Sequence, residues 1–186
     1  MARSGLLGVL LAAVAGPVAA APPPAPPLAA YGALPAVEEV TLSPDGRRLA
    51  YIGVLGEDRT LIVREIGGPA LAAFRLGPTK VRDVDFADAD RLLIATSVTD
   101  RPTIIGWRMP TAEWMQVHSY DLKAQKMVTL MSRTPNTMNT VAGLPDVAVR
   151  EGRMVALTPG YTLVPPQARL DLYRVDLSTG VGRIEQ

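Results

Sequence analysis

A pattern that repeats three times constrains the fold of this chain more than any other feature. A polar turn precedes a short apolar strand, and a later strand ends in an acidic residue, an aliphatic residue and a turn. The first phrase spans Ser43–Ile52, Ala87–Ile94 and Arg150–Leu157, and the second spans Ile62–Gly68, His118–Ala124 and Leu172–Gly180. The acidic residues of the second phrase, Glu65, Asp121 and Asp176, lie 56 and 55 residues apart. Several short strands repeated at this period are typical of β-propeller blades, so the sequence predicts about three blades.

The rest of the chain also favours an all-β fold, because short β-rich runs alternate with Gly, Pro and Asp turns. The clearest hairpin is Val37–Val54, in which Pro44 presets φ for a tight turn and Gly46 accepts a positive φ. Leu49–Val54 is apolar at nearly every position, so we expect this strand to be covered on both faces. One stretch, Trp114–Met127, is also compatible with a weak helix.

The C-terminal residues predict an unfinished sheet. Leu172–Asp176 predicts a strand, Ser178–Gly180 a turn and Gly182–Gln186 the start of another strand. Propellers close with about 4–8 blades, so about three antiparallel blades over residues 31–186 form only part of a ring. An open ring exposes apolar blade faces, which soluble monomers rarely do on a large scale. We therefore expect either a fragment of a longer protein or assembly with another copy, and we favour the fragment.

The N-terminus predicts export. Arg3 precedes the apolar run Leu6–Val14, Pro17 interrupts that run, and small residues follow at Val18–Ala20. We interpret residues 1–21 as a signal peptide that is cleaved, and residues 22–30 as a Pro-rich linker. A retained membrane anchor is the alternative, but a span needs about 20 apolar residues and Pro17 comes too early. The expected location is periplasmic or secreted, with no membrane association after cleavage.

Composition excludes several classes of function. Lys and Arg total 19 against 18 Asp and Glu, so no basic field exists to bind nucleic acid. Cysteine is absent, which excludes disulfides, thiolate nucleophiles and Cys-ligated metals. The one histidine, His118, alternates with Val117 and Ser119 on a predicted strand, and we interpret it as an ordinary strand residue and not a catalytic base. We therefore assign no catalytic, cofactor-binding or metal-binding residue, and we expect no cofactor.

An acidic cluster raises the possibility of a calcium site. It consists of Asp83, Asp85, Asp88 and Asp90. Counted from Asp83, an EF-hand loop would need Gly at its sixth position and Glu at its twelfth, where this chain has Asp88 and Ile94. We interpret the cluster as a strand with alternating polar residues that enters an Asp-rich turn.

Three segments carry a resemblance to a known family. Tyr31–Ile52 resembles the start of the propeller in bacterial prolyl oligopeptidase-family serine peptidases, which include dipeptidyl- and acylaminoacyl-peptidase-like enzymes. Val81–Ile94 is similar to their second-blade phrase, and Leu170–Gly180 is similar to a third. The resemblance covers residues 31–186. The Leu-Ser-Pro-Asp-Gly phrase that ends at Gly46 also occurs in TolB-like periplasmic propellers.

The resemblance implies a parent protein in which the propeller caps an α/β-hydrolase domain and restricts entry to short peptides. That domain would carry a Gly-x-Ser-x-Gly elbow and later an Asp and a His. This chain contains no Gly-x-Ser-x-Gly, so no catalytic residue is carried over and the chain alone should be inactive. The expected partners are the missing C-terminal hydrolase domain and the parent's short peptide substrates. The alternative is a TolB-like periplasmic interaction module without enzymatic activity.

Glu113 is the one residue for which the resemblance suggests a substrate contact. In relatives that remove N-terminal dipeptides, glutamates that project from the propeller hold the ammonium group of the substrate. Glu113 lies in the longest insertion between predicted strands, near Trp107 and Trp114. Since no second glutamate accompanies it, we interpret Glu113 as a solvated loop residue and the tryptophans as packing or lid residues.

Overall fold

The computed structural model describes residues 25–32, 35–55, 58–104 and 106–185. The predicted signal peptide and the linker up to residue 24 lie outside the described residues. Contacts divide the chain into residues 1–33 and residues 34–186, and each unit is described by itself. In the first unit, Leu28–Tyr31 forms the 3-10 helix η1. No helix in the described part of the chain is long and apolar enough to cross a membrane.

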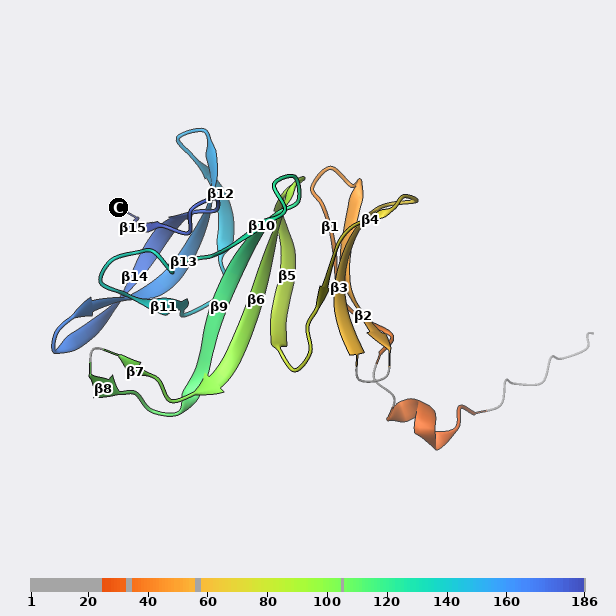
Figure 1. The fold of residues 1–186 in the computed structure, drawn as a ribbon, viewed down its shortest axis with the longest axis horizontal. Coiled ribbons are helices and arrows are strands. Elements are labelled where there is room, and N and C mark those ends of the chain that lie inside the picture. The colour runs from red at the N-terminus through yellow and green to blue at the C-terminus, as the bar shows by residue number, and fades with distance from the viewer. Residues whose placement is uncertain (1–24, 33–34, 56–57, 105, 186) are drawn as a thin grey trace, which may run out of the picture. The chain divides into compact units, whose positions relative to one another are not determined.

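The second unit consists of antiparallel strands (Figure 1). Sheet 1 has the order β1 (Val37–Leu42), β2 (Arg48–Leu55), β3 (Asp58–Glu65), β4 (Ala70–Arg75). Sheet 2 comprises β5 (Lys80–Asp88), β6 (Arg91–Asp100), β9 (Ala112–Asp121) and β10 (Lys126–Thr129). Sheet 3 comprises β12 (Asp146–Arg150), β13 (Arg153–Val164), β14 (Gln167–Asp176) and β15 (Gly182–Ile184).

Two further elements interrupt this regular plan. β11 (Thr137–Val141) pairs with both β9 and β13, and so joins sheets 2 and 3 into one hydrogen-bonded array. β7 (Thr103–Ile104) and β8 (Trp107–Arg108) form a small hairpin inside the connection from β6 to β9. The repeat did not predict either element, because each occurs once.

The sequence repeat coincides with the three sheets. Its first phrase covers the turn before the second strand of each sheet and the first residues of that strand, which is β2, β6 or β13. Its acidic residues, Glu65, Asp121 and Asp176, each end the third strand of a sheet. Each sheet is a four-stranded antiparallel meander. The chain is therefore an all-β protein that forms part of a β-propeller, and the predicted number of blades is confirmed.

Local side chains explain the first hairpin. The Ser43 hydroxyl donates to the Asp45 carboxylate at 2.6 Å and accepts the Arg48 N–H at 2.9 Å, which closes the turn between β1 and β2. Gly46 has a φ of 69°, as the sequence predicts. The weak helix considered for Trp114–Met127 is wrong, because this stretch forms most of β9 and the start of β10. Strand pairing prevails there because β9 pairs with β6 from Ala112 to Asp121.

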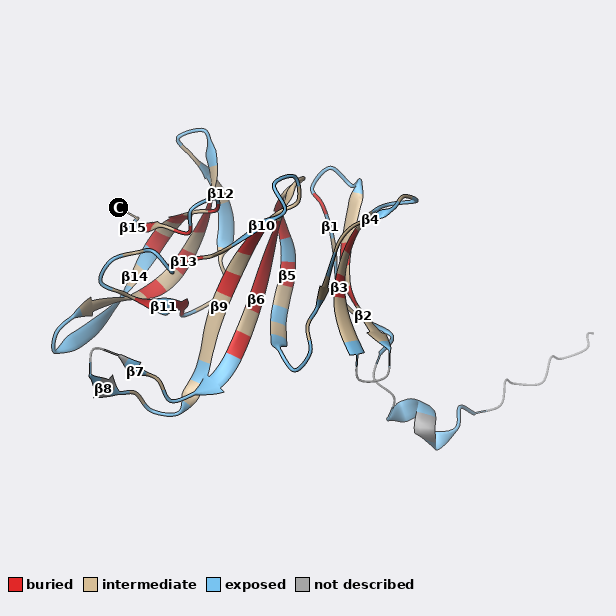
Figure 2. Cartoon of the chain, in the orientation of Figure 1, coloured by how far each residue is buried: buried red, intermediate tan, exposed pale blue. Residues whose placement is uncertain are grey.

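The core lies between the sheets in two layers (Figure 2). β6 contributes to both layers, because Leu92 and Ile94 pack toward sheet 1 while Leu93 and Ala95 pack toward sheet 3. All four side chains are at most 4% exposed. Each sheet is thus held by the apolar side chains that it buries against its neighbour, and burial of each large side chain contributes about 1.5–3 kcal/mol.

The prediction that Leu49–Val54 is covered on both faces is wrong for one face. Ala50 and Ile52 are fully buried against sheet 2, whereas Leu49 and Tyr51 on the opposite face are only partly buried. Sheet 1 is the first of the three sheets, so within the described residues no earlier sheet covers that face.

Candidate functional site

His118 lies in the middle of β9 with both ring nitrogens engaged. Its Nε2 is 3.2 Å from the Thr96 hydroxyl on β6, and its Nδ1 is 3.0 Å from the Thr129 hydroxyl on β10. Burial lowers the pKa of His118, so the neutral imidazole is favoured in the folded chain. These contacts, to two threonines on the neighbouring strands, are those of a histidine that helps to hold its sheet together.

The lowered pKa of His118 predicts a pH-dependent stability. The His118 imidazole binds a proton more tightly in the unfolded chain than in the folded chain. Its contribution to the free energy of unfolding is therefore full above the unfolded pKa of about 6.5, and it is lost as pH falls through the folded pKa. We expect the melting temperature to drop between pH 7.5 and pH 5.5. A His118→Gln variant should show a smaller drop, since the chain has no other histidine. Equal drops in both proteins would contradict this assignment.

The acidic cluster is divided between a strand and a turn. Asp83, Asp85 and Asp88 lie on β5, and Asp90 lies in the turn that follows. The Asp90 carboxylate is held by Arg48 of sheet 1 at 2.6 Å and by Lys123 at 2.5 Å. Among the residues that the structure describes, no group of three acidic or histidine side chains is placed to hold a metal ion.

Glu113 lies on β9 and not in a loop, so that part of our interpretation is wrong. Its carboxylate accepts the Ser97 hydroxyl at 2.8 Å, contacts the Arg82 guanidinium and lies 3.6 Å from the Lys80 ammonium. The Ser97 and Arg82 hydrogen bonds lower its pKa. A substrate ammonium group would have to compete with two resident cations for this carboxylate.

The two tryptophans near Glu113 lie on different strands. Trp114 follows Glu113 on β9, where its indole N–H donates to the Asp100 carbonyl at 3.0 Å. Trp107 lies on β8, in the small hairpin. The contact of Trp114 ties the end of β6 to β9, which is a packing role.

A charged edge lies where the first strands of sheets 1 and 2 come together. β1 runs beside β5, and the Thr41 hydroxyl on β1 donates to the Asp85 carboxylate on β5 at 2.8 Å. Burial, and secondarily the neighbouring Asp85 charge, raises the pKa of Asp83. Propeller blades surround a central channel, and the strands that converge line it. The polar side chains of β1 and β5 are therefore the candidate lining of such a channel.

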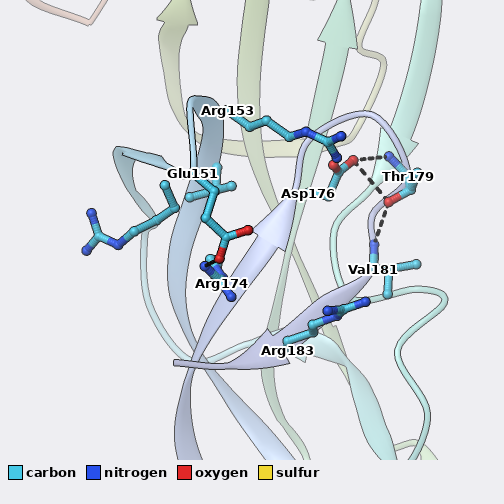
Figure 3. A pocket seen from close by; sticks show the side chains of 9 residues that line it. Glu151, Arg153, Arg174, Asp176, Thr179, Val181 and Arg183 are labelled. Carbon is cyan, nitrogen blue, oxygen red and sulfur yellow. Dashed lines mark hydrogen bonds and ion pairs between the residues drawn. The ribbon is translucent and has the colours of Figure 1, made fainter. Parts of the chain in front are cut away.

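A second candidate is a pocket of about 250 Å³ on sheet 3 (Figure 3). Arg174 contacts Glu151 at 3.0 Å on its wall, and Asp176 accepts the N–H groups of Ser178 and Thr179, both at 2.9 Å. Arg153 and Arg183 form no ion pair with any described residue. The pocket is lined by Arg150, Glu151, Arg153, Val155, Arg174, Asp176, Thr179, Val181 and Arg183.

Sequence reasoning missed this pocket. Its four arginines come from four different strands, or from the residues that begin or end them, over residues 150–183. Arginine at alternate positions of a strand is an ordinary signature of a solvated face, so no spacing in the sequence marked them. The surplus of guanidinium groups makes the pocket suited to a carboxylate, which arginine binds with paired hydrogen bonds.

Comparison with known proteins shows no family for this chain. No protein-family model matches the sequence, and no curated protein matches it. A solved structure described as acylaminoacyl peptidase in complex with Z-Gly-Gly-Phe-chloromethyl ketone aligns with 82% of this chain at 12% identity and a TM-score of 0.46. The aligned region spans 25% of that structure's chain. The likeness assigns no activity to this chain.

Proposed function

We propose that this chain is the non-catalytic, substrate-gating part of a β-propeller in an exported serine peptidase that hydrolyses short peptides. One observation carries the proposal. The three segments that resemble the propeller of prolyl oligopeptidase-family peptidases fall one in each of three successive sheets: Tyr31–Ile52 includes β1 and the start of β2, Val81–Ile94 includes most of β5 and the start of β6, and Leu170–Gly180 includes the end of β14. The resemblance therefore follows the structural unit of the fold and is not confined to one turn.

The charged edge supports a gating role. Thr41 and Asp85 meet across β1 and β5, and Asp83 lies beside them on β5. The width and the charge of a channel lined by such groups decide which peptides can pass through it. Short peptides carry charge at both ends. On this proposal the catalytic residues belong to an α/β-hydrolase domain, which is the partner of this chain, and the protein acts in the periplasm or outside the cell.

The first test is an activity assay on purified residues 22–186. We expect no hydrolysis of aminoacyl or dipeptidyl p-nitroanilides above the buffer rate, because His118 is committed to Thr96 and Thr129. The assay records p-nitroaniline release over a day, with a serine peptidase as positive control. Turnover that is lost in a His118→Ala variant would show that the chain is itself catalytic, and the proposal would fail.

The second test concerns the parent protein. Sequencing the gene beyond the codon for Gln186, together with the intact mass of the native product, should reveal a Gly-x-Ser-x-Gly elbow followed by Asp and His. Further sheets without a hydrolase domain would instead support the alternative, a TolB-like interaction module.

A further inference from the structure

We propose that the layer between sheets 2 and 3 holds a binding site for one water molecule, formed by Arg91 on β6 and Ser119 on β9. Two polar atoms, Arg91 Nε and Ser119 Oγ, are buried and have no hydrogen-bond partner among the residues that the structure describes. Native proteins rarely leave buried polar groups unpaired, so a partner that is not part of the chain is expected at these two atoms.

The strand register brings the two unpaired atoms into the same part of this layer. Arg91 pairs with Asp121, and Leu93 pairs with Ser119, so Arg91 and Ser119 are diagonal neighbours across β6 and β9. Alternate residues of a strand share a face, so both side chains lie on the face of sheet 2 that carries Leu93 and is turned toward sheet 3. Diagonal neighbours are within reach of a long side chain such as arginine. One small molecule can therefore contact both atoms.

The rest of the Arg91 guanidinium is already engaged by both sheets. Its Nη2 donates to the Asp121 carboxylate at 2.7 Å, and its Nη1 donates to the Ser178 hydroxyl of sheet 3 at 2.9 Å. Among its three nitrogens, only Nε is left without an acceptor in the described chain. The Asp121 carboxylate also balances the positive charge of the guanidinium, so the site has no net charge to attract an anion. A neutral ligand is therefore favoured.

Water has the hydrogen-bonding groups that the two atoms require. It accepts the Nε–H of Arg91, which is a donor only, and donates to the Ser119 hydroxyl oxygen, which accepts as well as donates. Buried waters typically bridge two to four polar groups that would otherwise be unpaired. Ser119 is 1% exposed, so a ligand larger than water would have to displace the surrounding core.

The core around the site is made of smaller side chains than the core on the other face of sheet 2. The layer between sheets 2 and 3 contains three buried alanines, Ala87, Ala95 and Ala156, whereas the layer between sheets 1 and 2 contains only Ala50 among its buried residues. Smaller side chains fill less volume, which favours a small bound molecule in this layer. The site lies between two described sheets, so it goes beyond the proposed function and does not rest on it.

Sheet 1 carries a valine at the position that Ser119 occupies in sheet 2. There Arg48 pairs with Glu65 and Ala50 pairs with Val63, just as Arg91 pairs with an acidic residue one step before Ser119. Val63 is fully buried in an apolar layer. The fold therefore accepts valine at this position, and a Ser119→Val substitution gives sheet 2 the side chain of sheet 1 and removes one wall of the water site.

The first experiment counts the long-lived internal waters of the purified chain by magnetic relaxation dispersion of the water oxygen nuclei. We expect Ser119→Val to hold one water fewer than the wild type. Thr140→Val is the matched control, because Thr140 is also buried but its hydroxyl already donates to the Met115 carbonyl at 2.6 Å. This control should keep the wild-type count. An unchanged count in Ser119→Val, or an equal loss in the control, would overturn the proposal.

The second experiment measures the stability of Ser119→Ala by urea unfolding. If the hydroxyl binds water, its removal breaks a hydrogen bond and should raise the equilibrium constant for unfolding about two- to tenfold. A hydroxyl that is buried without any partner destabilises the folded chain, so its removal would lower that constant. The sign of the change therefore decides between the two cases, and a stabilised Ser119→Ala variant would overturn the proposal.

A crystal structure of the purified chain identifies the ligand. We expect a water peak at about 2.5–3.2 Å from both Arg91 Nε and Ser119 Oγ. Crystals soaked in sodium bromide should show no anomalous peak at this position, because the site carries no net positive charge. A bromide peak there would show that the site takes an anion and would overturn the assignment to water. A Ser119 hydroxyl that donates directly to a backbone carbonyl, with no water beside it, would overturn the site itself.

Discussion

Replacement of Gly180 by alanine is expected to lower the free energy of unfolding by about 2–5 kcal/mol, the sum of backbone strain and overpacking. Gly180 has a φ of 73°, which an L-residue rarely adopts. A Cβ atom would lie 2.5 Å from the Thr129 carbonyl oxygen and 2.9 Å from a methyl group of Val128. The turn between β14 and β15 rests here on the end of β10, so sheet 3 would have to move away from sheet 2.

The control for this prediction is Gly46→Ala. Gly46 has a similar φ of 69°, but nothing lies within 4 Å of its ideal Cβ position. It should therefore lose only the backbone contribution of about 1–2 kcal/mol. Urea unfolding followed by circular dichroism gives both values. Equal losses at the two glycines would show that the contact between the turn and β10 carries no strain.

Replacement of Leu61 by alanine is expected to cost about 2–5 kcal/mol, as for other fully buried leucines. Leu61 lies on β3, is 0% exposed and belongs to the layer between sheets 1 and 2. Its truncation leaves a cavity in the layer that also holds the aromatic pair Phe74 and Tyr120, whose ring centroids are 4.7 Å apart in an edge-to-face arrangement. A single domain of this size has a stability of only about 5–15 kcal/mol, so the loss is large.

Leu55→Ala is the matched control on the neighbouring strand. Leu55 ends β2 and is 84% exposed, so its truncation should change stability by less than about 0.5 kcal/mol. The same urea titration compares the two variants. If Leu61→Ala were as mild as Leu55→Ala, the layer between sheets 1 and 2 would not be a packed core.

Much of the fold follows from local sequence signals. Ser43–Gly46 predicts the first turn, because its serine, aspartate and glycine satisfy the turn with short-range hydrogen bonds and a positive φ. Asp121 and Asp176 mark the ends of their strands because the carboxylate accepts N–H groups of the turn that follows: Asp121 accepts from Lys123 and Ala124, and Asp176 from Ser178 and Thr179. Signals of this kind act over a few residues and can therefore be recognised from the sequence alone.

Features that depend on distant contacts were not predictable in the same way. Trp114–Met127 has no strong local preference, and its pairing with β6 decides that it is a strand. The placement of Glu113 beside Lys80 and Arg82 depends on the register of β5, β6 and β9. The pocket of sheet 3 brings together arginines from separate strands, which no spacing in the sequence indicates.

The sequence by itself determined the all-β class, the three-fold repeat and the turns, since these rest on strand propensity and on the backbone freedom of particular turn residues. Only the tertiary structure decided which face of each sheet is covered. Ala50 and Leu172 both occupy strands of mixed apolar and polar residues, yet one is buried and the other is 46% exposed. The physical reason is that burial depends on the neighbour that packs against a sheet, and a repeat specifies the sheet without specifying how many neighbours it has.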